Sequence, residues 1–150
     1  MIESNQEVRE MPIQTEQAET TTFGGVSTVK PFQQAFELTF AQGVNQVTGT
    51  IGVPPGKQFV IETVTADIGV GDQEQPFLFV TTVAKGVEAQ HTIALEELPR
   101  QPNVFCATYP IRLYADPGST VTVMVTRFGG GTFPAIPKPE LVTLSGFITP

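Results

Sequence analysis

Short stretches of alternating hydrophobic and polar residues run through the chain after residue 31. In residues 119–128, Val121, Val123 and Val125 share one phase, and threonines with Met124 occupy the other. Alternation with a period of two is typical of a β-strand with one buried face. Comparable segments, eight in number, occupy residues 35–41, 46–53, 57–70, 76–84, 89–95, 103–109, 111–115 and 141–148.

Turn-forming residues separate these segments. The chain contains 14 Gly and 13 Pro, and Pro-Gly steps at residues 55–56 and 117–118 each precede a valine-rich segment. Frequent turns between short alternating segments favour an antiparallel sandwich over parallel βαβ units. We therefore predict an all-β fold, an antiparallel β-sandwich that is jelly-roll-like, with about eight strands. Residues 95–100 (LEELPR) predict at most one helical turn, and Pro110 is expected to separate two strands.

The first 31 residues differ in composition from the rest of the chain. They carry five glutamates against Arg9 and Lys30, and their large hydrophobic residues are sparse. Such a segment cannot by itself bury enough surface to offset the entropy lost on ordering. The sequence therefore predicts an extended acidic arm over residues 1–31 and a β-sandwich domain over residues 32–150. The arm is expected to lie along its own domain or along a neighbouring copy.

The charge of the chain argues against nucleic acid as a partner. The formal net charge is −7, and the eight basic residues are scattered singly along the sequence. An acidic surface without a basic cluster repels phosphate backbones and anionic lipid surfaces. The N-terminal residues lack the apolar core of a signal peptide, and no stretch approaches the ~18 apolar residues of a membrane helix. The sequence thus predicts a chain made in the cytoplasm without membrane insertion, which leaves incorporation into a particle open.

Two acidic regions, residues 67–74 and the turn at Asp116, raise the question of a chemical site. Asp67, Asp72 and Glu74 lie near glycines and could supply oxygen ligands to Ca²⁺, although their spacing does not match the calcium-binding loop of EF-hands. The alternative is a solvated hairpin tip, which we prefer. Asp116 precedes Pro-Gly, and Asp commonly hydrogen-bonds its own backbone in such turns. We therefore interpret Asp116 as the corner between two strands.

The remaining reactive residues do not form a convincing catalytic set. Cys106 is the single cysteine and His91 the single histidine, so a zinc site would lack ligands and a Cys–His pair has no sequence support. Cys106 stands among hydrophobic residues, which favours a small buried side chain. Glu37 and Glu62 could be proposed as a glycosidase pair, but each is equally explained by a solvated strand face. We expect no catalytic residues, no cofactor and no enzymatic activity.

Carbohydrate binding has little support in the aromatic composition. The chain has no Trp and two Tyr, Tyr109 and Tyr114, whereas its 11 Phe are suited to cores and apolar contacts. The glycine runs at residues 24–25 and 129–131 are not phosphate loops, because neither is followed by Lys-Ser/Thr and a helix. The proline-rich loop that follows the second run is expected to be an extended binding loop or a strap.

These patterns predict a non-enzymatic structural protein. In this hypothesis a β-sandwich subunit self-associates, or decorates a larger particle such as a shell, filament or virion, through its N-terminal arm. The alternative is a ligand-binding β-sandwich for carbohydrate or Ca²⁺. The residues expected at the interface are the hydrophobic residues of the arm and of the 129–140 loop: Val8, Met11, Ile13, Phe23, Val26, Val29, Phe133 and Ile136.

Overall fold

The computed structural model describes residues 9–10 and 29–150 of the chain. Every regular element in these residues is a β-strand. The strands are β1 (Arg9–Glu10), β2 (Lys30–Leu38), β3 (Gln46–Gly52), β4 (Gln58–Gly69), β5 (Glu74–Ala84), β6 (Val87–Ile93), β7 (Glu96–Leu98), β8 (Gln101–Ala115), β9 (Thr120–Gly129) and β10 (Glu140–Thr149).

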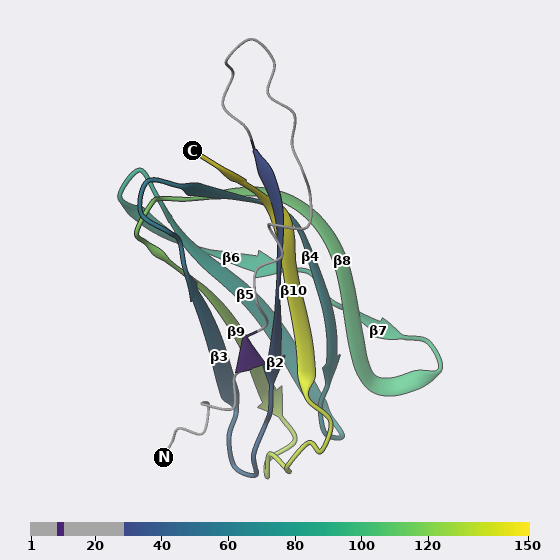
Figure 1. The fold of residues 1–150 in the computed structure, drawn as a ribbon. Helices are drawn as coiled ribbons and strands as arrows, with labels where there is room; N and C mark the ends of the chain where they lie inside the picture. Colours follow the sequence, from purple (N-terminus) through teal and green to yellow (C-terminus); the bar gives the residue numbers. More distant parts are fainter. Residues whose placement is uncertain (1–8, 11–28) are drawn as a thin grey trace.

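The strands form two antiparallel sheets that pack face to face (Figure 1). One is six-stranded, in the order β1-β2-β10-β4-β8-β7, and the other is four-stranded, in the order β3-β9-β5-β6. Two of the ten strands are very short, β1 with two residues and β7 with three, so eight long strands build the sandwich. The prediction of an antiparallel β-sandwich with about eight strands is confirmed.

Successive long strands usually lie in different sheets. From β2 to β5 each connection crosses between the sheets, and so do those from β8 to β9 and from β9 to β10. Crossing connections bring residues far apart in sequence to the same end of the sandwich. One end therefore gathers residues 41–45, 70–73 and 129–139.

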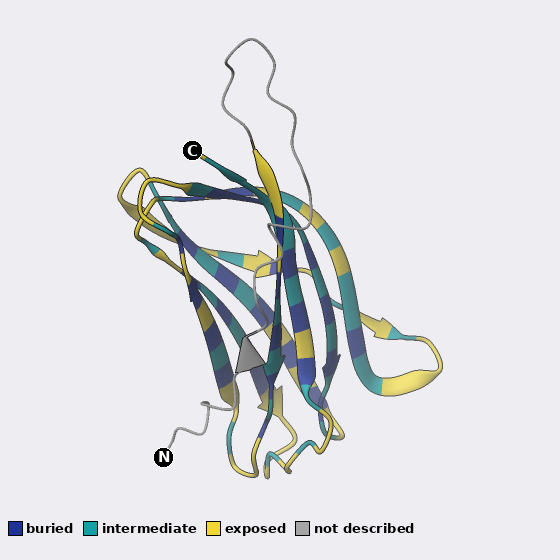
Figure 2. Cartoon of the chain, in the orientation of Figure 1, coloured by how far each residue is buried: buried dark blue, intermediate teal, exposed yellow. Residues whose placement is uncertain are grey.

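The core lies between the sheets and is built largely from alternate residues of the long strands (Figure 2). On β9, Val121, Val123 and Val125 are fully buried, as their common phase predicts. Phe36 and Phe59 are fully buried on the opposite sheet, and Phe59 stacks on Phe32 with 4.5 Å between ring centroids. Phenylalanine thus supplies much of the core volume, in line with the absence of Trp.

Two sequence expectations for residues 95–115 were wrong. Residues 96–98 form the short strand β7, so residues 95–100 contain no helical turn. Pro110 does not separate two strands, because β8 runs continuously from Gln101 to Ala115. The ladder between β4 and β8 shifts register between Ile61 and Thr63, where Thr63 lies opposite Pro110. A proline, which has no N–H to donate, is tolerated in a sheet at such a bulge.

The described part of the arm adds a strand to the sandwich. Residues 9–10 form β1, which pairs with the edge of β2 so that Arg9 lies opposite Glu37 and Glu10 opposite Phe36. Strand β2 begins at Lys30, two residues before the expected start of the domain at residue 32. The rest of the predicted arm up to residue 28 lies outside the described residues.

Candidate functional site: a buried ion network at one end of the sandwich

Three ionisable residues occupy inward-facing positions at one end of the sandwich. Arg127 continues the row of buried valines on β9, Glu74 begins β5, and Glu140 begins β10 in phase with Val142. All three are buried, and Arg127 is completely inaccessible to solvent. Buried ionisable groups must either find a partner or stay neutral, because an unpaired ion in the protein interior is costly.

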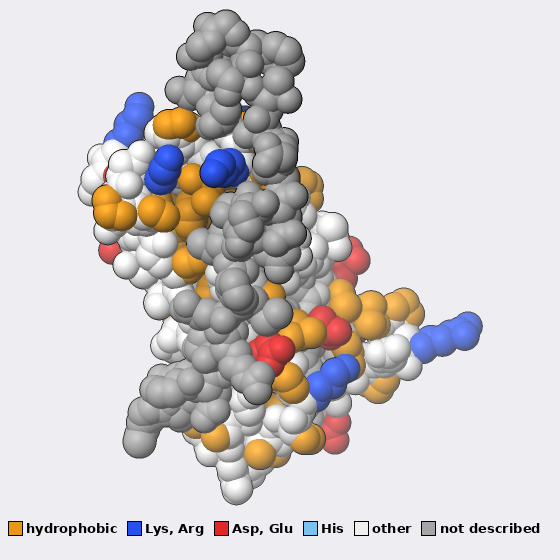
Figure 3. Space-filling view, in the orientation of Figure 1, with side chains coloured by type: hydrophobic (Ala, Val, Ile, Leu, Met, Phe, Trp, Pro, Cys, Tyr) orange, Lys and Arg blue, Asp and Glu red, His pale blue; other side chains and the backbone are white. Residues whose placement is uncertain are grey.

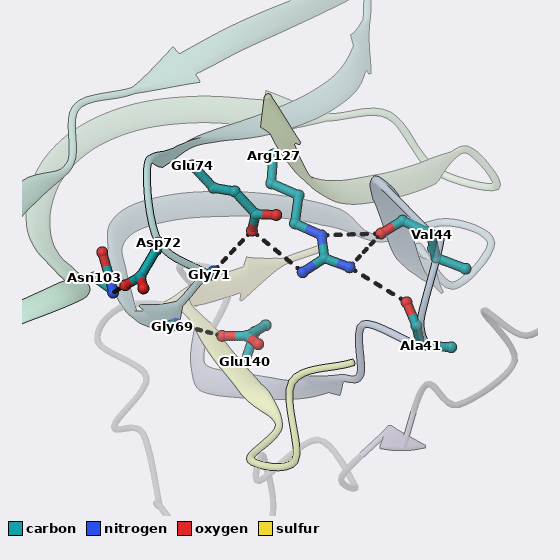
Figure 4. A network of polar contacts seen from close by, with 9 residues as sticks. All are labelled: Ala41, Val44, Gly69, Gly71, Asp72, Glu74, Asn103, Arg127 and Glu140. Carbon is teal, nitrogen blue, oxygen red and sulfur yellow. Dashed lines mark hydrogen bonds and ion pairs between the residues drawn. The ribbon is translucent and has the colours of Figure 1, made fainter. Parts of the chain in front are cut away.

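Arg127 connects two parts of the chain that are far apart in sequence (Figure 4). Its Nε and Nη2 donate to the carbonyl oxygen of Val44 at 2.9 and 2.7 Å, and Nη2 also donates to that of Ala41 at 3.3 Å. Its Nη1 donates to Glu74 Oε1 at 3.3 Å, and the guanidinium carbon lies 4.4 Å from the Phe40 ring centroid. Burial lowers the pKa of Arg127, and the carboxylate of Glu74 opposes that shift. The guanidinium stays charged, since an arginine in a protein does not lose its proton.

Glu74 holds the turn that leads into its own strand. Its Oε1 accepts a hydrogen bond from the backbone N–H of Gly71 at 2.7 Å. The glycines at residues 129–131 all have positive φ, and Gly130 passes close to the side chain of Glu74. A Cβ on Gly130 would lie 2.7 Å from Glu74 Cγ. A glycine is therefore needed at position 130 to let the backbone approach the ion pair.

Glu140 is a buried carboxyl group of a different kind. Its Oε1 accepts a hydrogen bond from the backbone N–H of Gly69 at 2.6 Å, while Oε2 has no hydrogen-bond partner within the described residues. Burial raises the pKa of Glu140 to about 8; the Gly69 N–H and the charge of Arg127 lower it, and Asp67 adds to the rise. At neutral pH Glu140 is thus protonated, and the network contains one guanidinium and one paired carboxylate.

We expect the stability of the protein to fall as pH rises toward 8. The folded state keeps the Glu140 proton up to about pH 8, whereas the unfolded chain releases it near pH 4.5. The proton on Glu140 therefore adds stability that is fully present below the pKa of the unfolded chain. This added stability is lost as pH rises through the pKa of Glu140 in the folded state. The variant E140Q, which is neutral and can still accept from Gly69, should lose this dependence. Urea unfolding between pH 5 and 8.5 measures it; parallel pH profiles for wild type and E140Q would contradict the assignment.

A second set of polar contacts ties the neighbouring loops together. Asn103 Nδ2 donates to Asp72 Oδ1 at 2.7 Å, and the Asn103 backbone N–H donates to Glu97 Oε2 at 3.0 Å. Asn103 has a positive φ of 71°, a conformation that asparagine tolerates better than most residues. The loop between β4 and β5 is thereby attached to the start of β8. Together with Arg127, these contacts fix three loops at one end of the sandwich.

The structure gives the three calcium candidates different roles. Glu74 is paired with Arg127, Asp72 accepts from Asn103, and Asp67 lies on β4 opposite Leu141 and Cys106. Over the described residues, no group of three or more His, Cys, Asp or Glu is arranged to hold a metal ion. The expectation of a solvated hairpin tip is wrong for Glu74, which is buried, although Asp72 is exposed. The sequence did not indicate the pairing of Glu74 with Arg127 or the burial of Glu140.

The other reactive residues are also apart. Glu62 forms an exposed ion pair with Arg112 at 3.1 Å. Glu37 lies on β2, which β10 separates from the strand of Glu62. Cys106 belongs to the six-stranded sheet and His91 to the four-stranded sheet. The sequence suggested that Cys106 is fully buried, but it is only half-buried. Burial raises the pKa of its thiol, with a contribution from Asp67, which favours the unreactive thiol form.

Asp116 is a strand corner, as predicted, but its side chain accepts hydrogen bonds from another hairpin and not from its own turn. Its two carboxylate oxygens accept hydrogen bonds from the backbone N–H groups of Lys85 and Gly86, each at 2.9 Å. These two N–H groups belong to the turn between β5 and β6, which lies next to the Asp116 turn between β8 and β9. The Asp116 carbonyl oxygen accepts from Ser119 within its own turn. The hydrogen bonds from Gly86 and Lys85 lower the pKa of Asp116.

The variant D116A should lower the melting temperature at pH 7, because it leaves two hairpin N–H groups without their acceptor. Since the folded pKa of Asp116 is lowered, its contribution is present above the unfolded pKa and is lost as pH falls through the folded pKa. The difference in melting temperature between wild type and D116A should therefore shrink below pH 4. A difference that stays constant down to pH 2.5 would contradict this.

The residues predicted for an interface divide into three groups. Phe133 and Ile136 are used within the chain: Phe133 lies over Arg127, at 5.4 Å from the guanidinium carbon, and Ile136 packs against the core. Val29 is exposed. The other five, Val8, Met11, Ile13, Phe23 and Val26, lie outside the described residues.

A groove opens beside the short strand β7, which projects with the start of β8 beyond the body of the sandwich (Figure 1). The groove has a volume of about 600 Å³ and is lined by residues 94, 96–99 and 106–109. The polar residues of this lining are Glu96, Glu97, Thr108 and Tyr109. Strand β7 pairs with β8 only as far as Cys106, so the edge of β8 beyond that residue borders the groove.

Comparisons of the chain with protein-family models and with curated proteins found no match. Among the residues that the structure describes, no helix is long and apolar enough to cross a membrane.

Proposed function

We propose that this protein is a structural subunit, a jelly-roll β-sandwich that assembles with further copies of itself by exchanging its N-terminal strand. The buried network at one end supports a structural role, because Arg127 and Glu74 form hydrogen bonds with the backbone of neighbouring loops. The observation that carries the proposal is strand β1, in which residues that precede the domain add to the edge of β2. An exposed sheet edge with free N–H and C=O groups accepts an added strand.

The strand order supports the jelly-roll assignment. The eight long strands follow the orders β2-β10-β4-β8 and β3-β9-β5-β6. Two four-stranded sheets connected by Greek keys are typical of jelly rolls, a fold used by viral capsid proteins and by lectins. Because one fold serves unrelated functions, the strand order alone does not choose between assembly and ligand binding.

The length of chain between β1 and β2 favours exchange. Residues 11–29 connect the two strands. Along β2, Glu37 and Lys30 are seven residues apart, which at ~3.3 Å per residue is a distance of ~23 Å. The connection formed by residues 11–29 could span up to ~60 Å if fully extended, which is well beyond ~23 Å. The same strand can therefore reach β2 of its own chain or β2 of a neighbouring copy, the condition for domain swapping.

Ligand binding is the second candidate, and the groove beside β7 favours it. Its volume of about 600 Å³ is within the usual range for small-molecule sites, ~300–1,000 Å³. On the face drawn in Figure 3, hydrophobic side chains cover the projecting hairpin and a basic side chain lies at its tip. A glycan array and a melting shift on adding Ca²⁺ would test this candidate; binding that the variant Y109A abolishes would support it.

Light scattering of the full chain and of a chain reduced to residues 29–150 tests the assembly proposal. The shortened chain should fold, because the buried core residues that the structure describes all lie between Phe32 and Leu144. We expect a large defined oligomer for the full chain and a much smaller species for the shortened one. Replacing both β1 residues by proline should have the same effect, whereas Q17P, outside β1, should not. Equal masses for the full and shortened chains would contradict the proposal.

A further inference from the structure

The outer face of the four-stranded sheet is almost free of charge. Since neighbouring side chains on a strand point to opposite faces, the residues that alternate with the buried ones face outward. Glu88 is the one charged residue among these outward positions of the described strands β3, β9, β5 and β6. The others are Gln46, Thr48, Thr50, Gly52, Thr120, Thr122, Met124, Thr126, Phe128, Gln75, Phe77, Phe79, Thr81, Val83, Gln90 and Thr92.

Three phenylalanines form a cluster on this face. The Phe77 and Phe79 ring centroids are 6.4 Å apart, and Phe77 meets Phe128 edge-on at 5.5 Å. Phe77 is 38% exposed and Phe128 51% exposed. Met124 lies directly across the ladder from Phe79. A contiguous exposed apolar cluster with a polar rim is a mark of an interaction site.

The outer face of the other sheet has a different character. Its outward residues include Glu37, Asp67 and Glu96, which lie on neighbouring strands in one row with Leu141 and Cys106. The exposed pair of Glu62 and Arg112 lies on the same sheet. The chain as a whole carries a formal charge of −7. Apart from Glu88 on the edge strand β6, the outer face of the four-stranded sheet is uncharged, and it is therefore a local exception on an acidic molecule.

We propose that this uncharged face binds the same face of a second copy of the chain, which deepens the proposed assembly function and rests on it. Two copies that each carry −7 repel one another, and bringing like charges together across an interface is costly. The face of Phe77, Phe79 and Phe128 lets two copies approach without that cost. It carries no charge pattern for a nucleic acid, an anionic membrane or an oppositely charged partner.

The side chains around the cluster suit a two-fold contact. A symmetric dimer requires a patch that is complementary to itself. Threonine hydroxyls and glutamine amides each donate and accept hydrogen bonds, so identical copies of this rim can satisfy one another. A two-fold axis that passes through the cluster places the phenylalanines of the two copies in contact. The strands of two sheets packed face to face then lie within ~30° of each other.

The area of the face is sufficient for a specific contact. Four strands spaced ~4.8 Å apart, over about eight residues at ~3.3 Å each, give roughly 500 Å² per copy. The two copies together bury ~1,000 Å², the low end for specific interfaces. Such a dimer is weak by itself, and it strengthens the assembly when β1 exchange holds the same copies together, because linked contacts raise the effective concentration.

Sedimentation analysis over a range of concentrations tests this face in the chain of residues 29–150, whose whole described core is retained. We expect this chain to dimerise reversibly, and the variant F77T/F128T to raise the dimer dissociation constant at least tenfold. Y114T is the matched control, because Tyr114 is 43% exposed on the other sheet and should leave the constant unchanged. Threonine is favoured in strands, and equal melting temperatures would show that the variants are folded.

Two results would overturn the proposal. One is a monomer at every concentration, which assigns the face to a partner of other chemistry. The other is dimerisation that F77T/F128T leaves intact. Neither result affects the comparison of the full chain with the shortened chain, so failure of this face and failure of arm exchange are distinguishable.

Discussion

Replacing Arg127 by methionine is expected to cost about 3–5 kcal/mol of folding free energy, the cost of breaking a buried ion pair by removing one partner. The variant leaves the buried carboxylate of Glu74 without its cation, and it removes the donors to the carbonyl oxygens of Val44 and Ala41. An unpaired buried acceptor retains its desolvation cost. Urea unfolding at pH 7 measures the loss.

The chain supplies its own control for this prediction. Arg112 and Glu62 also form an Arg–Glu pair, but their side chains are 60% and 40% exposed. The variant R112M should therefore change stability by about 0–1 kcal/mol, as is typical of surface pairs. In addition, the double variant R127M/E74Q should lose less than the sum of the two single variants, because it leaves no buried charge unpaired. Similar losses of folding free energy in R127M and R112M would show that burial does not determine the contribution of the Arg127–Glu74 pair.

Replacing Gly146 by alanine is expected to destabilise the fold by about 3 kcal/mol, at the upper end of the cost of overpacking. Gly146 follows the register shift between β10 and β4, where the two backbones approach closely. A Cβ at this position would collide with the carbonyl oxygen of Val60 and lie 3.1 Å from the backbone nitrogen of Glu62. Backbone atoms inside a sheet cannot move aside as the end of a flexible side chain can.

Gly52 is the matched control for this substitution. It lies on β3, and a Cβ there meets no atom within 4 Å. The variant G52A should change stability by about 0.5 kcal/mol or less, as expected for a surface position without special contacts. Thermal unfolding of the two variants compares them directly. A G146A protein as stable as G52A would mean that the approach of β10 to β4 is looser than described.

Much of the sandwich could be predicted because the alternation of residues reports which side of a strand is buried. The phase of Val121, Val123 and Val125 identified the inner face of β9 correctly. The same phase contained an overlooked signal: Arg127 continues it, and Glu140 shares the phase of Val142 and Leu144. A charged residue in a buried phase predicts a buried ion, but the sequence does not show which strands meet at that end of the molecule.

Other features could not be read locally, because they depend on pairing between distant strands. The partners of Asp116 are 30 and 31 residues away in the chain, whereas turn chemistry suggested a bond within its own turn. Pro110 indicated a break, yet a register shift with β4 accommodates it. The uncharged outer face of the four-stranded sheet likewise becomes visible only when the order β3-β9-β5-β6 is known.

Disulfide trapping tests the proposed strand exchange most directly. Arg9 and Glu37 are Cα partners in an antiparallel ladder. Such partners lie ~4.5–5.5 Å apart, within the range that a disulfide bridges. One chain would carry R9C and the other E37C, each with C106S so that no other thiol is present. T20C, outside β1, replaces R9C as the control.

We expect the two chains, mixed and oxidised, to form a covalent heterodimer, and the T20C control to form none. The bond can form only if β1 of one copy pairs with β2 of another. The contradicting result is that a chain with both R9C and E37C closes its own disulfide while the mixed chains stay separate. The arm would then pair only within its own sandwich.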